Sequence, residues 1–217
     1  DLGDHRLDPA GADFLRELYE QGLAEFAHVN GLDLAGKVSF EANRETIPEP
    51  PELVLPERAL VAMGGGKDSL VALEMLREAD IEVQPVTVGG SALVAETVAA
   101  AGLPLLRIER RLAPELAELN RAGAWNGHVP VTAINSLVLL CAAILYGFRW
   151  VVFANERSAD EATLEDARGR AVNHQYSKSL AFEGALADRV ERTVAGGLEY
   201  CSLLRPLWEV AVAERFS

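Results

Sequence analysis

The sequence predicts an α/β fold in which a parallel sheet is flanked by helices, with a mainly helical piece at its N-terminus. From residue 58 onward, short apolar runs alternate with amphipathic segments. A glycine-rich stretch follows the first apolar run and leads directly into an amphipathic segment. Hydrophobic residues make up 49% of the 217 positions, which is typical of a globular chain with a full core. This alternation indicates parallel strands joined by helical crossovers.

The N-terminal piece begins with a predicted helix. Asp8 suits the capping position and Pro9 the first position of a helix. Apolar residues then recur near helical spacing up to Val29. Gly31 is expected to end the helix, because glycine is common just past a helix C-terminus.

An extended linker is predicted after this helix. A short strand is possible at 37–41, and four prolines fall within 47–56, which favours extended chain over helix. We therefore divide the chain into an N-terminal helical and linker piece, 1–57, and a nucleotide-binding domain, 58–217. The first piece is expected to be a lid, a substrate platform or part of a second domain.

The second piece is predicted to alternate strands with helices. Strands are expected at 59–63, 82–88, 105–108 and 149–154. Helices are expected at about 68–79, 91–101, 114–121, 131–146, 180–194 and 198–216, the last of them broken at 205–206. Ligands of such sheets bind at the carboxyl ends of the strands. That rule selects the loops after Met63, Val88 and Ala154.

The glycine loop is the most specific of these three. Gly64-Gly65-Gly66-Lys67-Asp68-Ser69 joins a predicted strand to a predicted helix N-terminus. Glycines let backbone N–H groups approach a ligand, and a helix N-terminus adds unpaired donors, so the stretch predicts a phosphate site. The spacing excludes a Walker A loop, because Asp68 follows Lys67. It also excludes the dinucleotide fingerprint, because Ser69 stands at its last glycine. The alternative is a simple turn.

This loop resembles the pyrophosphatase loop of the PP-loop ATPases, Ser-Gly-Gly-x-Asp-Ser, with Gly64 in place of the first serine. The resemblance implies that ATP is split between its α and β phosphates. The β,γ-pyrophosphate is then expected on the loop, with the adenine or ribose near Val88. The implied ATP-binding residues are Gly64, Gly65, Gly66, Lys67, Asp68, Ser69 and Val88, and Mg²⁺ is the implied metal.

Composition narrows the class of partner. The net charge of −13 disfavours a nucleic-acid partner. Two cysteines without a C-x-x-C pair give no zinc or redox signature and suit a reducing cytoplasm. We see no signal peptide, and the longest apolar run, 137–146, is too short for a bilayer span, so no membrane association is expected. Because the chain starts without methionine, we expect a fragment.

Three polar clusters interrupt the apolar pattern. The first precedes and enters the most apolar helix, and the second leaves the strand at 149–154. The third precedes the helix at 180–194. Each has a structural alternative: helix capping with a satisfied core amide for the first, a charged surface loop for the second, and a capped helix N-terminus for the third. Their candidate site residues are Asn126, His128, Asn135, Asn155, Glu156, Arg157, Asn173, His174, Tyr176 and Lys178.

Together the loop and clusters resemble the UDP-N-acetylmuramoyl-L-alanyl-L-glutamate epimerases of bacterial peptidoglycan synthesis. The motifs that carry the resemblance are GGGKDS (64–69), NGHVPVTAINS (126–136), NERSA (155–159), NHQYSKS (173–179) and YCSLLRP (200–206). The first 58 residues match less distinctly. Members of that family are longer than this chain, so the resemblance implies that the second piece is truncated at its C-terminus, beyond Ser217. The resemblance implies ATP-dependent inversion of the terminal L-glutamate to D-glutamate through an acyl-adenylate, with release of AMP and pyrophosphate.

The same resemblance suggests roles for the candidates. The proton-transfer pair is expected among His128, Glu156, His174, Tyr176 and Lys178, with the two histidines favoured. Substrate binding is assigned to Asn126, Asn135, Asn155, Arg157 and Asn173, and metal binding to Asp68 and Glu156. The implied partners are the UDP-muramoyl dipeptide and, functionally, a ligase that adds L-glutamate to UDP-N-acetylmuramoyl-L-alanine.

Two other interpretations remain open at this stage. A PP-loop amidotransferase or tRNA-modifying enzyme shares the loop and the adenylation, but we expect it to carry a basic surface or a working cysteine pair. A non-catalytic ATP-binding module of the stress-protein kind shares the sheet, but has no use for the later polar clusters.

Overall fold

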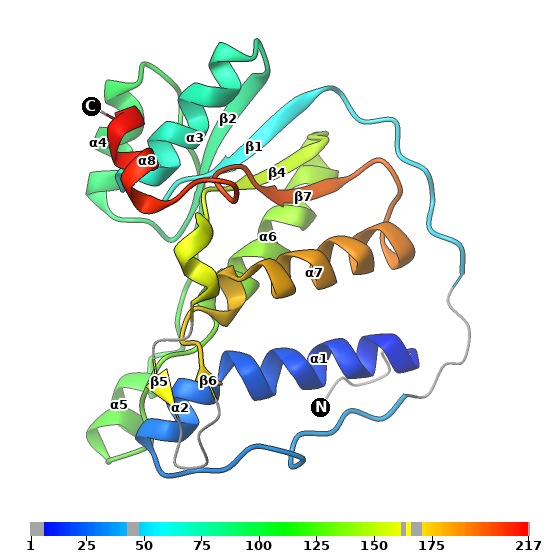
Figure 1. Ribbon diagram of the computed structural model, residues 1–217, viewed down its shortest axis with the longest axis vertical. Coiled ribbons are helices and arrows are strands. Elements are labelled where there is room, and N and C mark those ends of the chain that lie inside the picture. The colour runs from blue at the N-terminus through cyan, green and yellow to red at the C-terminus, as the bar shows by residue number, and fades with distance from the viewer. Residues whose placement is uncertain (1–6, 43–47, 162–163, 166–170, 217) are drawn as a thin grey trace.

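A computed structural model describes residues 7–42, 48–161, 164–165 and 171–216. Its centre is a five-stranded sheet in the order β3-β2-β1-β4-β7, in which every neighbouring pair is parallel. Figure 1 shows β1 near the middle of this sheet. The strands are β1 (Arg58–Ala62), β2 (Glu82–Val88), β3 (Leu106–Ile108), β4 (Trp150–Phe153) and β7 (Glu199–Ser202). The α/β class with a parallel sheet is therefore confirmed.

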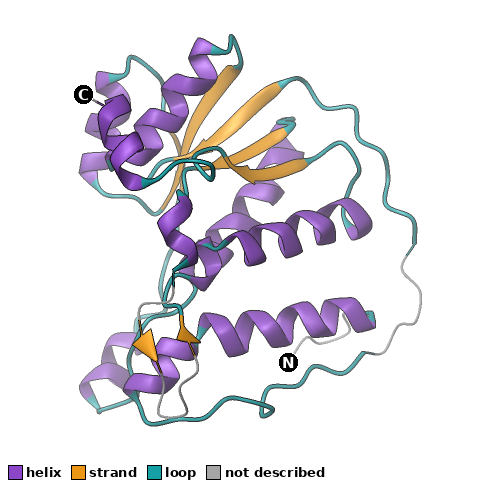
Figure 2. Ribbon diagram, viewed as in Figure 1, coloured by secondary structure: helices purple, strands orange, loops and turns teal. Residues whose placement is uncertain are grey.

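Helices cover both faces of the sheet (Figure 2). On one face lie α3 (Lys67–Glu78) and α4 (Ala92–Ala100), with α8 (Glu209–Phe216) packed against α3. On the other lie α6 (Val131–Tyr146) and α7 (Leu180–Thr193). The remaining described elements are α1 (Pro9–Gly22), α2 (Ala24–Val29), α5 (Glu115–Arg121), the short 3-10 helices η1 (Arg157–Asp160) and η2 (Tyr176–Lys178), and the two-residue strands β5 (Leu164–Glu165) and β6 (Ala171–Val172).

Alternation along β1 explains why both faces are covered. Leu60 packs with α6 and α7, whereas Ala59 and Val61 pack with α3 and α4. All three side chains are fully buried. Successive side chains of a strand point to opposite faces, so an unbroken apolar run is what a strand needs when it is buried on both sides.

Two N-terminal expectations are wrong. The predicted helix up to Val29 is two helices, which part at Leu23, where the preceding Gly22 lies against Pro130 of the α6 start. Residues 37–41 form no strand in the described chain. Phe40 instead packs edge-on against Tyr19 of α1, with ring centroids 5.4 Å apart.

The helix predicted at 198–216 is also wrong over its first half. β7 occupies Glu199–Ser202 and pairs with β4, and the helix α8 begins at Glu209. The burial pattern explains the strand, because Leu198, Tyr200 and Ser202 are buried while the residues between them are less so. That period of two is the signature of a strand. Apolar residues next to it in the sequence hide the alternation.

The N-terminal helix α1 lies beside α7 (Figure 1). Phe14 stacks with Phe182 of α7 at 6.2 Å between ring centroids, and Asp8 forms a two-pronged ion pair with Arg189 of α7. Glu17 accepts a hydrogen bond from the Tyr176 hydroxyl of η2 at 3.0 Å. The first helix is therefore part of the packing that supports η2.

We predict that Asp8→Ala lowers the free energy of unfolding by about 1–3 kcal/mol, because it removes a helix cap and a largely buried partner of Arg189. The Arg189 hydrogen bond lowers the pKa of Asp8 below its usual 3.8. The contribution is therefore fully present above pH ~4 and is lost as pH falls through the lowered pKa. Denaturant unfolding at pH 7 and pH 3 measures both effects. The control Asp13→Ala, which removes the exposed pair with Arg16, should change stability by less than about 0.5 kcal/mol.

The two cysteines should differ in reactivity. Cys141 is exposed on α6, whereas burial raises the pKa of Cys201 in β7 to about 11. Since the thiolate is the reactive form, iodoacetamide at pH 8 should modify Cys141 and leave Cys201 unmodified until the chain unfolds. Peptide mass spectrometry reads both sites. Equal labelling rates in the folded chain are incompatible with the position of β7.

No helix within the described ranges is long and apolar enough to cross a membrane.

Candidate functional site

The strand order creates a divergence at the carboxyl ends of β1 and β4. From β1 the chain moves outward through β2 to β3, then returns to the other side of β1 to form β4 and β7. The loops that leave β1 and β4 therefore run to opposite faces of the sheet. In open parallel sheets this is where ligands bind.

The glycine loop after β1 has the geometry of an anion site. Gly65 has φ +85°, which favours glycine, and a Cβ there would lie 3.1 Å from Val94 Cγ2. Cβ atoms at Gly64 or Gly66 would meet open space. Gly66 caps α3 without a side-chain hydrogen bond to the helix N-terminus. The first N–H groups of α3 thus face an open loop.

Charged side chains flank this loop. Lys67 Nζ lies 2.9 Å from Asp68 Oδ1 and 3.4 Å from Glu209 Oε1, at the start of α8. The hydrogen bond with Asp68 raises the pKa of Lys67 above its usual value. The Ser69 hydroxyl donates to the Gly66 carbonyl at 3.0 Å. The predicted loop residues therefore lie around one cationic group, the Lys67 ammonium.

A cavity of about 220 Å³ adjoins the loop. Asn135 of α6 reaches it, and its buried Oδ1 has no hydrogen-bond partner within the described ranges. A buried carbonyl oxygen without a donor is unfavourable, so its presence here suits a ligand that donates a hydrogen bond. The other lining residues are Ala62, Met63, Gly64, Val86, Thr87, Val88, Gly90, Ser91, Val94, Leu139 and Phe153. The structure thus brings Val88 and Asn135 together beside Gly64.

The cluster after β4 is held by the last residue of β7 and by the segment that follows it. Asn155 Nδ2 donates to Ser202 Oγ at 2.9 Å. The Arg157 N–H donates to the Leu207 carbonyl at 2.9 Å, and its guanidinium lies 4.7 Å from the ring centroid of Trp208. Arg157 is exposed, so the guanidinium that lies over the Trp208 ring is free to meet an anionic group from solvent.

Glu156 has a different environment from its neighbours. Its carboxylate accepts hydrogen bonds from the Ser158 N–H at 2.8 Å and from the Ser158 hydroxyl. It therefore caps η1, with both oxygens engaged. In the described chain no three or more His, Cys, Asp or Glu side chains are grouped to hold a metal ion. The expectation that Asp68 and Glu156 bind a metal stays a prediction.

The third cluster is anchored to η1 and α1. Asn173 Nδ2 donates to the Ala159 carbonyl at 3.0 Å, while its Oδ1 accepts from the Gln175 N–H at 2.7 Å. Burial, together with the Glu17 carboxylate, raises the pKa of Tyr176 well above its usual value. Tyr176 is therefore a protonated donor to Glu17 at neutral pH. Lys178 has an exposed side chain at the end of η2.

The structure brings together the two histidines that are 46 positions apart in the sequence. The rings of His128 and His174 lie 6.1 Å apart between centroids and meet edge to face at 87°. Helix α2 supports His128, because its N–H donates to Glu25 Oε2 at 3.0 Å. Asn30 Nδ2 donates to the Asn126 carbonyl at 3.0 Å. The N-terminal helices thus position one half of this histidine pair.

Sequence reasoning missed the residues that connect these groups. Ser202, Trp208 and Glu209 contact Asn155, Arg157 and Lys67, respectively. Ser202 ends β7, a strand that the sequence did not reveal, and the other two follow it. The helix predicted over 198–216 would place the three residues at different positions around its axis. The one signal was the resemblance carried by 200–206, which includes Ser202 but neither Trp208 nor Glu209.

Comparisons with known proteins agree on one family. The model of the MurL N-terminal domain family matches residues 2–203. A protein of Xanthomonas oryzae pv. oryzae (strain MAFF 311018) named UDP-N-acetyl-alpha-D-muramoyl-L-alanyl-L-glutamate epimerase is 50% identical over 216 residues, which are 100% of this chain and 48% of that protein. A Salinispora tropica protein of the same name is 39% identical over 212 residues, 97% of this chain and 46% of its own length.

This chain therefore spans about half the length of the curated relatives it matches. Among solved structures, a predicted subunit of tRNA methyltransferase from Methanocaldococcus jannaschii is similar with a TM-score of 0.44 and 16% identity, covering 74% of each chain. That likeness is too distant to bear on function.

Proposed function

The chain belongs to the MurL N-terminal domain family, and from this we propose that it is the ATP-using part of an epimerase that inverts the terminal L-glutamate of UDP-N-acetylmuramoyl-L-alanyl-L-glutamate. The observation that carries the proposal is the open glycine loop at the N-terminus of α3, next to a cavity reached by an Asn135 oxygen that has no hydrogen-bond partner among the described residues. The substrate is inferred from the names of the relatives.

The chemistry requires an activated carboxylate. Removing the Cα proton next to a carboxylate places two negative charges on adjacent atoms, which makes that proton very weakly acidic. Transfer of an adenylyl group from ATP to the carboxylate neutralises its charge. The Cα carbanion can then delocalise onto the carbonyl. Reprotonation on the opposite face, followed by hydrolysis, gives D-glutamate with AMP and pyrophosphate as the other products.

The loop residues fit the phosphates of ATP. The N–H groups of the first turn of α3 and Lys67 are donors at one open site, and Ser69, whose hydroxyl donates to the Gly66 carbonyl, fixes the loop there. Asn135 Oδ1 is placed to accept a hydrogen bond from the base or the ribose. Mg²⁺ commonly needs only one or two carboxylates beside phosphate oxygens and water, so Asp68 is sufficient as a protein ligand. Mg²⁺ would neutralise charge on those phosphates.

His128 and His174 are the best candidates for proton transfer. Glu156 has both oxygens engaged in capping, and Tyr176 is committed to Glu17. An imidazole can serve both as a general base and as a general acid, and these two rings lie on neighbouring loops. Because their rings are in contact, the substrate Cα has no room between them. We propose that the rings part when the muramoyl dipeptide binds, so that each reaches one face of the Cα.

Product analysis tests the nucleotide half of this proposal. Full-length protein with ATP, Mg²⁺ and the muramoyl dipeptide should form AMP and pyrophosphate in equal amounts. ADP as the product would show cleavage at the γ-phosphate and contradict adenylation. Nucleotide binding without cleavage would favour the ATP-binding module. AMP formation that depends on tRNA, and not on the muramoyl dipeptide, would favour the tRNA-modifying alternative.

A further inference from the structure

One short segment ties the separate parts of the candidate site together. Residues 205–209 lie between the end of β7 and the first residue of α8, and contacts from this segment reach three other parts of the site. Glu209 reaches Lys67 in the glycine loop at 3.4 Å, and Trp208 lies on the guanidinium of Arg157. At the other end of the segment, Arg205 reaches both η1 and η2.

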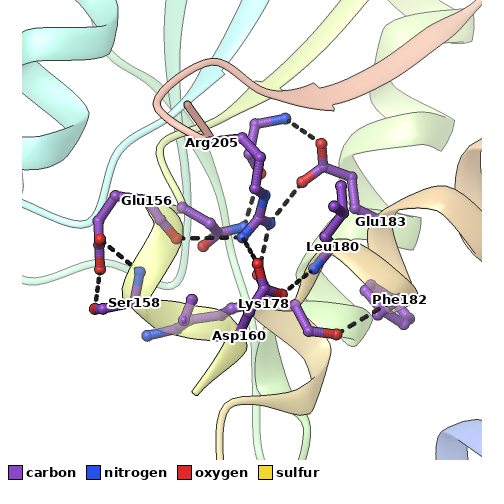
Figure 3. A network of polar contacts seen from close by, with 12 residues as sticks. Glu156, Ser158, Asp160, Lys178, Leu180, Phe182, Glu183 and Arg205 are labelled. Carbon is purple, nitrogen blue, oxygen red and sulfur yellow. Dashed lines mark hydrogen bonds and ion pairs between the residues drawn. The ribbon is translucent and has the colours of Figure 1, made fainter. Parts of the chain in front are cut away.

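Arg205 makes four contacts with its two terminal nitrogens (Figure 3). Nη2 donates to the Lys178 carbonyl and to Glu183 Oε2, both at 2.7 Å. Nη1 donates to the Glu156 carbonyl at 3.2 Å and lies 3.5 Å from Asp160 Oδ2. The Arg205 and Glu183 side chains are each 12% exposed. A planar fork that reaches four acceptors is a geometry that lysine cannot supply.

The partners of Arg205 are themselves fixed to the sheet and to α7. Glu183 Oε1 accepts from the Ser202 N–H of β7 at 3.0 Å, and Asp160 Oδ1 accepts from the Leu180 N–H at 2.6 Å. Figure 3 shows the Arg205 guanidinium between Glu183 and Asp160. The two ends of η1 and the end of η2 are thus bound to one rigid group. Between these points lies Arg157.

We propose that Arg205 is a positioning residue that sets η1 and η2 in one register, so that Arg157 and the segment containing His174 face the same bound substrate. It acts through backbone carbonyls and carboxylates and does not touch the reacting atoms. This inference rests on the proposed epimerase function. It differs from a purely stabilising ion pair, because its loss should reduce the chemical step without an equal loss of ATP binding.

The test compares full-length wild-type protein with Arg205→Met, Arg205→Lys and Glu183→Gln. We expect Arg205→Met to lower kcat for epimerisation by about 100-fold, the usual scale for a displacement near 1 Å. Arg205→Lys and Glu183→Gln keep part of the network and should fall by about 10-fold. The dissociation constant for ATP should stay within about threefold of wild type, because Arg205 does not contact the glycine loop. Hydrogen exchange should increase at 156–160 and 176–178 and stay unchanged at 82–88.

Arg149→Met is the matched control. Arg149 also forms two ion pairs, with Glu57 at 3.1 Å and Glu199 at 3.0 Å, but at the amino ends of β4 and β7. Its loss should leave kcat within about twofold, as for most exposed pairs. Wild-type kcat in Arg205→Met, or an equal loss of kcat and ATP binding, overturns the inference.

The remaining outcomes are also decisive. If Arg205→Met fails to fold, the two milder variants decide by the same readouts. If the wild type neither forms AMP nor inverts glutamate, the proposed function fails. In that case the hydrogen-exchange rates of η1 and η2 alone test the positioning role. Unchanged rates in Arg205→Lys and Glu183→Gln would contradict it.

Discussion

Gly65→Ala is expected to reduce ATP-dependent turnover of the full-length protein by about 100-fold or more. At φ +85° a side chain costs about 1–2 kcal/mol, and the new Cβ lies 3.1 Å from Val94 Cγ2. The loop must shift to relieve both, and a shift of about 1 Å at a phosphate site costs roughly 100-fold in rate. Calorimetric ATP binding and the rate of AMP release measure the effect.

Two other glycines serve as matched controls. A Cβ at Gly64 meets open space, so Gly64→Ala should fold like wild type but weaken ATP binding if that space holds phosphate. A Cβ at Gly184 within α7 also meets open space, and Gly184→Ala should add about 0.5–1 kcal/mol of stability with unchanged turnover. Unchanged ATP affinity in both Gly64→Ala and Gly65→Ala would remove the glycine loop from nucleotide binding.

His174→Asn and His128→Asn are each expected to lower epimerisation by about 10²–10⁴-fold, the range for loss of a general acid or base. ATP binding should persist, because neither ring lines the cavity beside the glycine loop. The variant that lacks the base should take up no deuterium from D₂O at the glutamate Cα. Chiral chromatography and mass spectrometry of the recovered glutamate follow both quantities.

His28→Asn is the control for this pair. His28 is exposed near the end of α2, and its replacement should leave turnover within about twofold of wild type. Deuterium uptake at the wild-type rate in both His128→Asn and His174→Asn would exclude the two histidines as the proton-transfer pair. Lys178 would then be the next candidate for proton transfer.

Much of the sheet follows from local pattern. The apolar run at 59–63 and the strand predicted at 82–88 became β1 and β2 with at most one residue of error, and the most apolar predicted helix became α6 with the predicted bounds. These elements are buried or capped in ways that a short window of sequence records. β7 was not predicted, because its alternation spans only four residues within a longer, mostly apolar stretch.

The assembly of the site is less accessible from sequence. The pairing of His128 with His174 and of Lys67 with Glu209 depends on strand order and on helix packing across the whole chain. A short window of sequence contains no information on these pairings. Glu183 looked like an ordinary first-turn acid of α7, although it is the buried partner of Arg205. The polar residues of the candidate site could nevertheless be selected from the sequence, because they interrupt its apolar pattern.

Incubation of full-length protein with ATP, Mg²⁺ and UDP-N-acetylmuramoyl-L-alanyl-L-glutamate in D₂O tests the central claim most directly. The proposed function predicts D-glutamate carrying one deuterium at its Cα, formed together with AMP and only when ATP is present. Inversion that proceeds without ATP, or AMP formation that leaves the glutamate L-configured and undeuterated, would contradict it.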